Sequence, residues 1–477
     1  MLKFPECAAG GRVFEFFEEI SKIPHGSGNT APIADYLEGF ARERALTVIR
    51  DGTDNVIIKK PATKGYEDRP CVIIQGHTDM VLAQEKNVNI DLQNEGLKLY
   101  IDGDFLKAEG TTLGADDGIA VAYALALLDS KDIPHPAIEA VFTSDEEIGL
   151  LGAAAIDGAN IDGRILINID SDAEGVFTAG CAGGLRTDTE ASFDTKTCQG
   201  HLYTLSVSAL RGGHSGIEIN RGRTNAIKYL FKILSTLDGV QLVSLNCGNA
   251  DNAIPRDARA TFVMKESLSS SALSDICDSA KNELAELGET DAGVTVTKNL
   301  TLAKKAISAE DSVRVIELVN EMPSGVLAMS EDIEGLVETS QNIGILTLED
   351  GNLRLTVSVR SAKGASKREA ADNIHAIAEK YGAKVTEHGE YPSWEYRRDS
   401  HLRDVMCEVY EKMYQKPAKV DIIHAGLECG LFSDKLEGLD AISFGPDNYD
   451  IHTPSERLSI SSAVRVWEFL LEVLKNI

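Results

Sequence analysis

Six short segments of the chain combine carboxylates or histidines with glycines and small polar residues. Carboxylate oxygens and imidazole nitrogens bind divalent cations, and a carboxylate beside a bound cation can act as a general base. Taken together, in this order along the chain, the six segments predict a site for two cations and an activated water. The segments are GHTDM (76–80), TTLGADDG (111–118), TSDEEIG (143–149), NIDSD (168–172), GGHSG (212–216) and IHTPSE (451–456).

His77 and Asp79 directly follow the apolar run 71–75, which is predicted to be a buried strand. Residues two apart in an extended chain face the same way, and functional groups of open α/β sheets gather at the carboxyl ends of strands. Asp79 is therefore placed to hold the second ring nitrogen of His77, as a histidine ligand usually requires. Taken alone, an H-x-D triplet carries little meaning.

Two acidic residues, Asp116 and Asp117, precede Gly118 and the predicted apolar helix 119–128. Either side chain could simply cap that helix. The alternative is that one of the two carboxylates bridges two cations, because it offers two oxygens from a loop punctuated by glycine.

Three consecutive carboxylates, 145–147, follow the apolar run 138–142. Crowding them is costly unless cations neutralise their charge. Because adjacent residues at a strand end point in different directions, one glutamate could bind a cation while its neighbour acts as general base. A solvated acidic loop is the alternative.

Three further residues complete the set. Asp170 ends the predicted strand 164–170, and His452 follows the predicted strand 441–446 and a turn. His214 lies between glycines and has no carboxylate nearby. It therefore resembles a donor that polarises a substrate carbonyl more than a metal ligand.

The elements that must position these residues indicate two parts. Helical and short apolar patterns alternate over the first 180 residues and return after about residue 395, which is typical of an α/β sheet covered by helices. Alternating, β-branched strands and amphipathic helices fill the stretch between them. We therefore predict one domain from residues 1–186 plus 395–477, and an inserted α+β domain over 187–394.

Composition excludes several classes of function. The net charge of −28 argues against nucleic acid and anionic membranes as partners. No stretch approaches the roughly 18 apolar residues of a membrane span, and no secretory pattern opens the sequence, so a cytoplasmic protein is expected. The eight cysteines have no pair at ligand spacing and are expected to be reduced thiols.

The ordered set resembles the co-catalytic zinc exopeptidases related to carboxypeptidase G, aminoacylase and carnosinase, and within them the aminoacyl-histidine dipeptidase branch. The similarity runs nearly end to end. The resemblance implies an α/β fold with a mixed-sheet catalytic domain and an inserted α+β lid domain. The phrases that carry it are KPAT (60–63), EGTTLGADDG (109–118), GCAGG (180–184), LRGGHSGIEI (210–219), NAIPRDA (252–258) and HAGLECGLF (424–432).

The resemblance also implies roles for individual residues. His77 and Asp170 would hold one metal, Glu147 and His452 the other, and Asp116 would bridge them. Glu146 would be the general base, Asp79 would orient His77, and His214 would stabilise the oxyanion, reaching the partner subunit's site in related dimers. Asn252, Arg360 and Gly426 would bind substrate. Relatives with a smaller lid place an arginine where this chain has FVMK (262–265). The residue that binds the C-terminal carboxylate of the substrate would therefore be Arg360.

The implied activity is hydrolysis of dipeptides, Xaa-His and a broader range, by a homodimer with two divalent metals per chain. Zinc is expected first, with cobalt or manganese as alternatives. An N-acyl amino acid deacylase, a carboxypeptidase or a tripeptidase is the alternative within the superfamily; Asp170, where the carboxypeptidase and aminoacylase relatives have Glu, favours the dipeptidase. A peptide-binding protein with an inactive hydrolase fold would be expected to lack a metal-binding residue or the general base. This chain keeps all of these residues.

Overall fold

The structure, a computed structural model, describes residues 11–299, 303–331 and 333–477. It divides into two compact units. Unit 1 contains the described residues up to Cys181, Tyr396–Ile422 and Leu427–Ile477, and unit 2 contains Ala182–Glu395 and Ile423–Gly426. Cys7 lies outside the described residues, and the other seven cysteines are free thiols.

An eight-stranded mixed sheet forms the centre of unit 1, in the order β1-β2-β6-β3-β7-β23-β8-β22. The central strands β6, β3, β7 and β23 run parallel to one another, whereas β1 and β2 are antiparallel to their neighbours and β8 is antiparallel to β23. The bounds are β1 Thr47–Arg50, β2 Val56–Lys60, β3 Val72–His77, β6 Ile138–Thr143, β7 Ile165–Asn168, β8 Val176–Cys181, β22 Lys419–Ile423 and β23 Asp440–Ser443.

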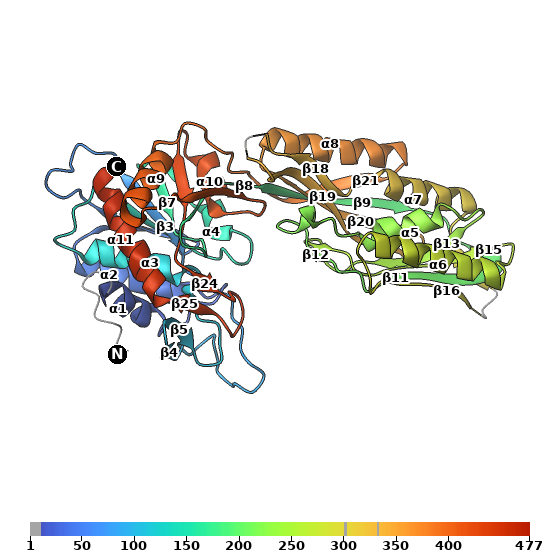
Figure 1. Cartoon of the computed structure of the whole chain (residues 1–477), viewed down its shortest axis with the longest axis horizontal. Coiled ribbons are helices and arrows are strands. Elements are labelled where there is room, and N and C mark those ends of the chain that lie inside the picture. Colours follow the sequence, from blue (N-terminus) through green and yellow to red (C-terminus); the bar gives the residue numbers. More distant parts are fainter. Residues whose placement is uncertain (1–10, 300–302, 332) are drawn as a thin grey trace. The chain divides into compact units, whose positions relative to one another are not determined.

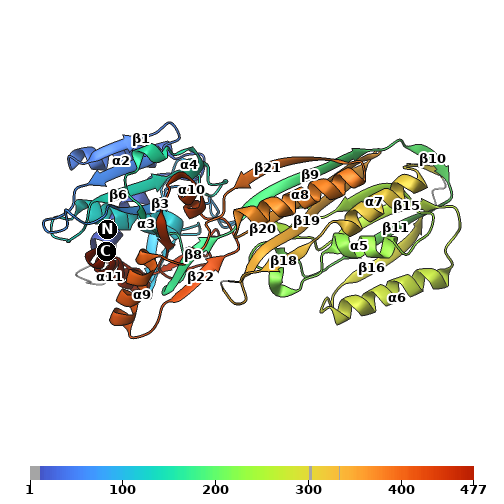
Figure 2. The same cartoon turned by 90° about the horizontal axis from the view of Figure 1, so that it is seen from above.

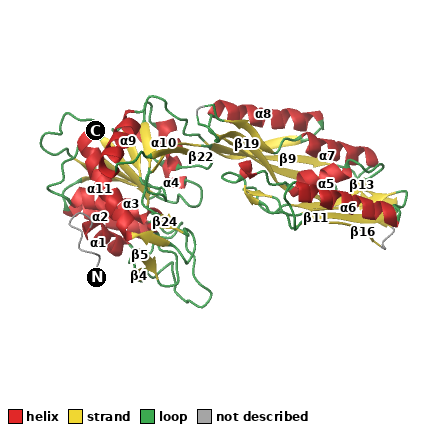
Figure 3. Ribbon diagram, in the orientation of Figure 1, coloured by secondary structure: helices red, strands yellow, loops and turns green. Residues whose placement is uncertain are grey.

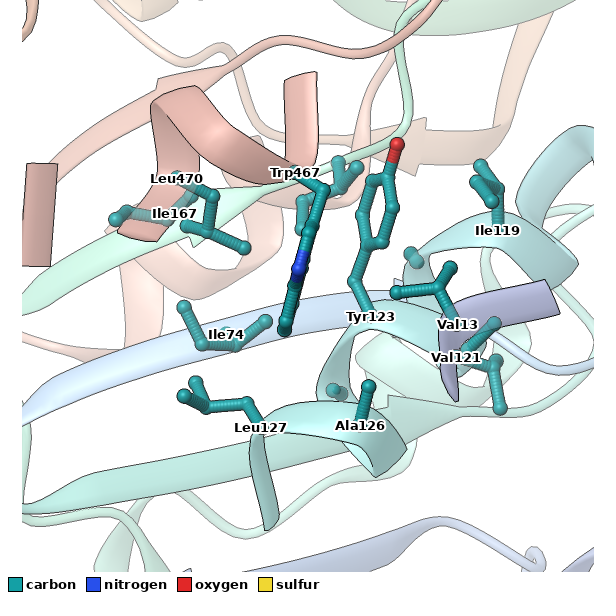
Figure 4. Close-up of a cluster of buried hydrophobic side chains, with 14 of the residues drawn as sticks. Val13, Ile74, Ile119, Val121, Tyr123, Ala126, Leu127, Ile167, Trp467 and Leu470 are labelled. Carbon is teal, nitrogen blue, oxygen red and sulfur yellow. The ribbon is translucent and has the colours of Figure 1, made fainter. Parts of the chain in front are cut away.

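Five helices of unit 1 share one apolar core with alternate residues of the central strands (Figures 1 and 4). Ile74 and Ile167 reach this core from β3 and β7, and the rings of Tyr123 and Trp467 stack in it with centroids 5.6 Å apart. The five helices are α1 Gly11–Ile20, α2 Ala31–Glu43, α3 Ala115–Asp129, α9 His401–Tyr414 and α11 Ile460–Asn476.

Two short helices and one small sheet complete unit 1. The helices α4 (Leu151–Ala155) and α10 (Glu428–Lys435) contact each other, and α10 also contacts β8 and β23. The small sheet joins β4 Leu99–Asp102, β5 Phe105–Ala108, β24 Asn448–Tyr449 and β25 Arg457–Ser459.

A nine-stranded antiparallel sheet forms unit 2, in the order β16-β11-β15-β13-β19-β20-β9-β21, with β18 also paired to β19. Figure 2 shows α8 lying along β9 and β20, which it contacts. The strands are β9 Gly183–Ser192, β11 His201–Ser208, β13 Gln241–Cys247, β15 Ala258–Met264, β16 Gly293–Asn299, β18 Gly325–Met329, β19 Val337–Glu349, β20 Asn352–Ser361 and β21 Lys384–Tyr391.

The helices of unit 2, red beside the yellow strands in Figure 3, bury apolar residues in one core with the sheet. They are α5 Ala226–Leu234, α6 Ser270–Glu286, α7 Ala309–Glu321 and α8 Gly364–Lys380. Two small two-stranded sheets join β10 (Lys196–Gln199) to β17 (Ala303–Ala306) and β12 (Gly213–His214) to β14 (Ala253–Ile254).

The mixed α/β fold predicted from the sequence is confirmed. The predicted strand 441–446 is shorter than expected: β23 ends at Ser443, and the chain then leaves the sheet toward Pro446. No helix within the described ranges combines the length and apolar character that crossing a bilayer requires.

Candidate active site

Three parallel strands end at one edge of the unit 1 sheet, and the predicted ligands follow there. His77, the last residue of β3, pairs in register with Thr143, the last residue of β6, and Gln75 pairs with Asn168, the last residue of β7. The acidic loop 145–147 and Asp170 come directly after β6 and β7. Parallel strands bring these segments together, as open α/β sheets do at their functional edge.

Asp116 lies between two imidazoles. Its Oδ1 is 3.0 Å from His77 Nε2, and its Oδ2 is 3.1 Å from His452 Nε2. His77, Asp116 and Asp170 form one group whose ligand atoms all lie within 4.8 Å of one another, and Asp116, Glu147 and His452 form a second. A third combination joins His77, Glu146 and Glu147. Asp116 is thus shared by the first two sets, and Glu147 by the last two.

The donor atoms fit two divalent cations. Glu147 Oε1 is buried and lies 2.8 Å from His452 Nε2, yet the contact lacks hydrogen-bond geometry, which leaves this oxygen without a hydrogen-bond partner among the described residues. Burial, with repulsion from Asp116, raises the pKa of Asp170 well above its ordinary value. Nitrogen and oxygen donors crowded in this way suit cations such as zinc, cobalt or manganese.

His77 is oriented by Asp79, through the main chain. His77 Nδ1 lies 2.9 Å from the Asp79 carbonyl oxygen and 3.5 Å from its carboxylate. The Asp79 carboxylate instead accepts hydrogen bonds from the Ser27 hydroxyl (2.8 Å) and the Glu146 amide (2.9 Å), with a longer one from Glu147. Asp79 therefore connects the end of β3 to the acidic loop.

The carboxyl group of Glu146, the predicted general base, lies in a buried and acidic environment. Burial, with the neighbouring carboxylates of Glu428 and Glu147, raises its pKa to about 8, while the nearby His77 opposes the shift. A base whose pKa lies near the working pH is effective in proton transfer.

Neither Asp116 nor Asp117 caps α3, which was the alternative reading. The range of α3 contains a break, since Asp116 and Asp117 have non-helical backbone angles, and among the described residues no helix amide donates a hydrogen bond to either side chain. Asp117 is buried with its Oδ2 unpaired among the described residues, and a Cβ on Gly76 would lie 2.5 Å from that oxygen. The glycine at 76 thus leaves room for Asp117 beneath β3.

Glu456 holds the Asp116 loop, a role that was not predicted. Its buried carboxylate accepts hydrogen bonds from the backbone amides of Leu113, Gly114 and Ala115 at 2.8–3.1 Å, and a longer one from Asp116. The segment IHTPSE was recognised for His452, but nothing local indicates that its last residue binds a loop 340 positions away.

Glu456→Gln is expected to lower the free energy of unfolding by about 3 kcal/mol, because the amide group places a donor against backbone donors and removes charge-assisted hydrogen bonds. Metal affinity should fall with it, since Asp116 loses its support. Thermal melts and metal analysis measure both, with the exposed Glu468→Gln on α11 as control. Wild-type stability and metal content in Glu456→Gln would contradict this role.

Glu428 is a second buried carboxyl group that sequence reasoning missed. Its Oε2 accepts hydrogen bonds from Gln75 Nε2 (2.6 Å) and the Thr143 hydroxyl (2.7 Å), near the ends of β3 and β6. Gln75 in turn accepts a hydrogen bond from Asn168 at the end of β7. This buried chain connects the three strands that carry the ligands.

The metal-free protein is expected to lose stability as the pH rises. Burial raises the pKa of Glu146 to about 8 and those of Glu428 and Asp172 to about 7. Unfolded carboxyl groups titrate near pH 4, so between about pH 4.5 and 8 the folded state binds more protons and stability falls with increasing pH. His452 acts in the same direction at higher pH, because its hydrogen bond to Asp116 and its close contact with the Glu147 carboxylate raise its pKa to about 10.

Bound cations would replace these protons. The difference in melting temperature between metal-loaded and chelated protein should therefore be larger at pH 8 than at pH 5. Calorimetry with and without chelator measures it. A difference that is equal at the two pH values would mean that the carboxyl groups do not couple to metal binding.

The four remaining predicted residues belong to unit 2. His214 Nδ1 accepts hydrogen bonds from the amides of Gly216 (3.1 Å) and Ile217 (3.2 Å), so the proton of the neutral ring is on Nε2, which can donate. Burial and the charge of Arg360 lower the pKa of His214, which favours this neutral form. Asn252 precedes β14 and has an exposed side chain; Gly426 lies in the segment 423–426.

Comparison with known proteins gives consistent similarities. Residues 73–476 match the model of peptidase family M20/M25/M40. The chain is 36% identical to cytosol non-specific dipeptidase of Escherichia coli (strain K12), over 98% of this chain and 97% of that protein. The crystal structure of aminoacylhistidine dipeptidase from Vibrio alginolyticus superposes with a TM-score of 0.88 and 34% identity, covering 98% of this chain and 96% of that one. Aminopeptidase PepT from Bacillus cereus, at 15% identity and a TM-score of 0.57, shares the fold.

Proposed function

The chain belongs to peptidase family M20/M25/M40 and is a peptide hydrolase, and we propose that it hydrolyses dipeptides, Xaa-His among them, at a two-metal site in unit 1. The observation that carries the proposal is Asp116, whose two oxygens face the imidazoles of two different ligand sets. The names of the two full-length relatives, both dipeptidases, support the choice of substrate.

Five residues would hold the metals: His77 and Asp170 one, Glu147 and His452 the other, with Asp116 between them. When bound, two divalent cations polarise the scissile carbonyl and acidify the attacking water. We propose zinc, with cobalt or manganese as the alternatives that the same nitrogen and oxygen donors accept.

The protein's own residues would move the proton. Glu146 accepts it from the attacking water and delivers it to the leaving amine, which its raised pKa favours. Asp79 keeps Glu146 in place through the amide hydrogen bond of 2.9 Å. His214 would donate from Nε2 to the oxygen on which negative charge develops.

Substrate would be recognised through its free carboxylate by Arg360, with Asn252 and Gly426 nearby in the binding surface. Among the described residues no carboxylate forms an ion pair with Arg360, and its Nε is buried without a hydrogen-bond partner. A partly buried guanidinium without a counter-charge is costly, so an anionic ligand is the expected partner. We further propose a cytoplasmic homodimer, as the resemblance implies.

The deciding experiment is hydrolysis of Ala-His, a tripeptide and N-acetyl-alanine by metal-stripped protein titrated with zinc, cobalt and manganese. Cleavage of Ala-His is expected to saturate near two metals per chain. The rates reached with zinc, cobalt and manganese rank the three metals. Turnover of N-acetyl-alanine alone would make the protein a deacylase, and preference for the tripeptide would make it a tripeptidase. Size measurement in solution tests the dimer.

A further inference from the structure

Four residues of unit 2 form a row across neighbouring strands. Ser340 on β19 pairs in register with Arg360 on β20, Arg360 pairs with Gly184 on β9, and Gly184 pairs with Tyr391 at the end of β21. Residues directly opposite in an antiparallel sheet project from the same face. Because Gly184 has no side chain, Arg360 and Tyr391 meet across it: Arg360 Nη1 donates a hydrogen bond to the Tyr391 hydroxyl at 2.9 Å.

Glycines leave room for the Tyr391 ring on two sides. A Cβ on Gly184 would lie 2.4 Å from the ring, and a Cβ on Gly426 would lie 2.8 Å from its Cε2. The backbone carbonyl of Tyr391 also accepts a hydrogen bond of 2.7 Å from the buried Lys367. Both the ring and its backbone are therefore held, and the position of the hydroxyl follows.

The segment 423–426 also contacts the row at its other end. His424 Nε2 lies 2.7 Å from the Ser340 hydroxyl, and both residues are buried. Burial, with the charge of Arg360, lowers the pKa of His424 to about 4, so this imidazole is neutral. The pKa of His214 is lowered too, so the neutral form of both rings is favoured and neither places a second positive charge beside Arg360.

We propose that Tyr391 is a positioning residue for Arg360: it fixes one arm of the guanidinium so that the remaining donors face the carboxylate of the substrate. Bidentate recognition of a carboxylate depends on the orientation of the planar fork, and a guanidinium held in place loses less entropy on binding. This inference rests on the proposed function. It also assigns a reason for glycine at 426, which is space for the Tyr391 ring.

The test is Tyr391→Phe, which removes one oxygen and keeps the ring. We expect KM for Ala-His to rise about tenfold, the low end for a hydrogen bond to a charged group, with kcat nearly unchanged. Gly426→Ala should raise KM in the same way by displacing the ring. The matched control is Tyr381→Phe, whose hydroxyl donates to Glu321 on the surface of the same unit; its kinetics should equal those of the wild type.

A second substrate separates positioning from general damage. The amide Ala-His-NH₂ has no free carboxylate. Tyr391→Phe and the wild type should therefore have the same KM for this substrate. The inference would be overturned if Tyr391→Phe raised KM equally for Ala-His and for Ala-His-NH₂, or if it did not raise KM for Ala-His. A fall in kcat without a change in KM would also do so.

Calorimetry with L-histidine and L-histidinamide gives a readout without turnover. Tyr391→Phe should weaken binding of histidine about tenfold and leave that of histidinamide unchanged. If the wild type binds histidine in this way but cleaves no dipeptide, the proposed function fails and the role of Tyr391 stands. If dipeptides are cleaved and neither measurement distinguishes acid from amide, the function stands and the role of Tyr391 fails.

Discussion

Glu146→Gln is expected to reduce kcat by about 10²–10⁴-fold while both metals stay bound. Glutamine keeps the size of the side chain and a carbonyl oxygen but cannot accept a proton from water. Glu146 belongs to only one of the three possible ligand sets, and the two sets that contain Asp116 do not include it. Single-turnover kinetics and metal analysis of the same preparation measure the two effects.

The control is Asp145→Asn in the same loop. Asp145 accepts a hydrogen bond from the Gly28 amide with one oxygen, and its φ of 51° is well tolerated by asparagine. Near-normal turnover is expected, because asparagine also has an acceptor oxygen. Loss of a metal from Glu146→Gln would instead identify Glu146 as a ligand.

Asp116→Ala should remove both metals from their normal sites and lower activity by about 10³-fold or more. The substitution deletes the carboxylate that the set with Asp170 shares with the set containing His452, and bound cations stabilise the transition state by several kcal/mol. It also leaves His77 and His452 without their nearest carboxylate oxygens at 3.0 and 3.1 Å. Metal content, measured after dialysis against low metal, should fall below one per chain.

Asp129→Asn at the other end of α3 serves as the comparison. Asp129 forms partly exposed ion pairs with Arg12 and Arg44, which contribute at most about 1 kcal/mol each, so metal content and activity should be retained. Two metals bound to Asp116→Ala would show that the carboxylate does not bridge, and the ligand assignment would have to be redrawn around Glu146 and Glu147.

Much of the fold could be predicted because its elements have clear local patterns. The apolar runs that became β3, β6 and β7 and the apolar helix α3 were placed within a few residues of their observed bounds. Strand β9 was missed, because its sequence GGLRTDTEAS has no apolar run. Thr187 and Thr189 are nevertheless fully buried there, between two neighbouring strands that satisfy the backbone. Helix α10 was missed because eight residues are too short for a periodic signal.

For the site, the residue types were predictable and their contacts were not. Asp79 was expected to hold His77 with its carboxylate, and the structure places the main-chain carbonyl closer, at 2.9 Å against 3.5 Å. The support of Asp116 by Glu456 and of the strand ends by Glu428 had no signal in the residues around them. Both carboxylates are buried, and a buried carboxylate requires partners that only the folded chain brings near.

The sequence by itself determined which groups stand at the ends of the strands, because an apolar run predicts a strand and the residue after it is then at the edge of the sheet. Tertiary structure alone decided how those groups are held: Glu456 against amides more than 300 residues earlier, and Arg360 against Tyr391 across Gly184. Hydrogen bonds between such distant segments leave no periodicity in the chain. They depend on register and on the space that a missing side chain provides, which exist only once the strands are paired.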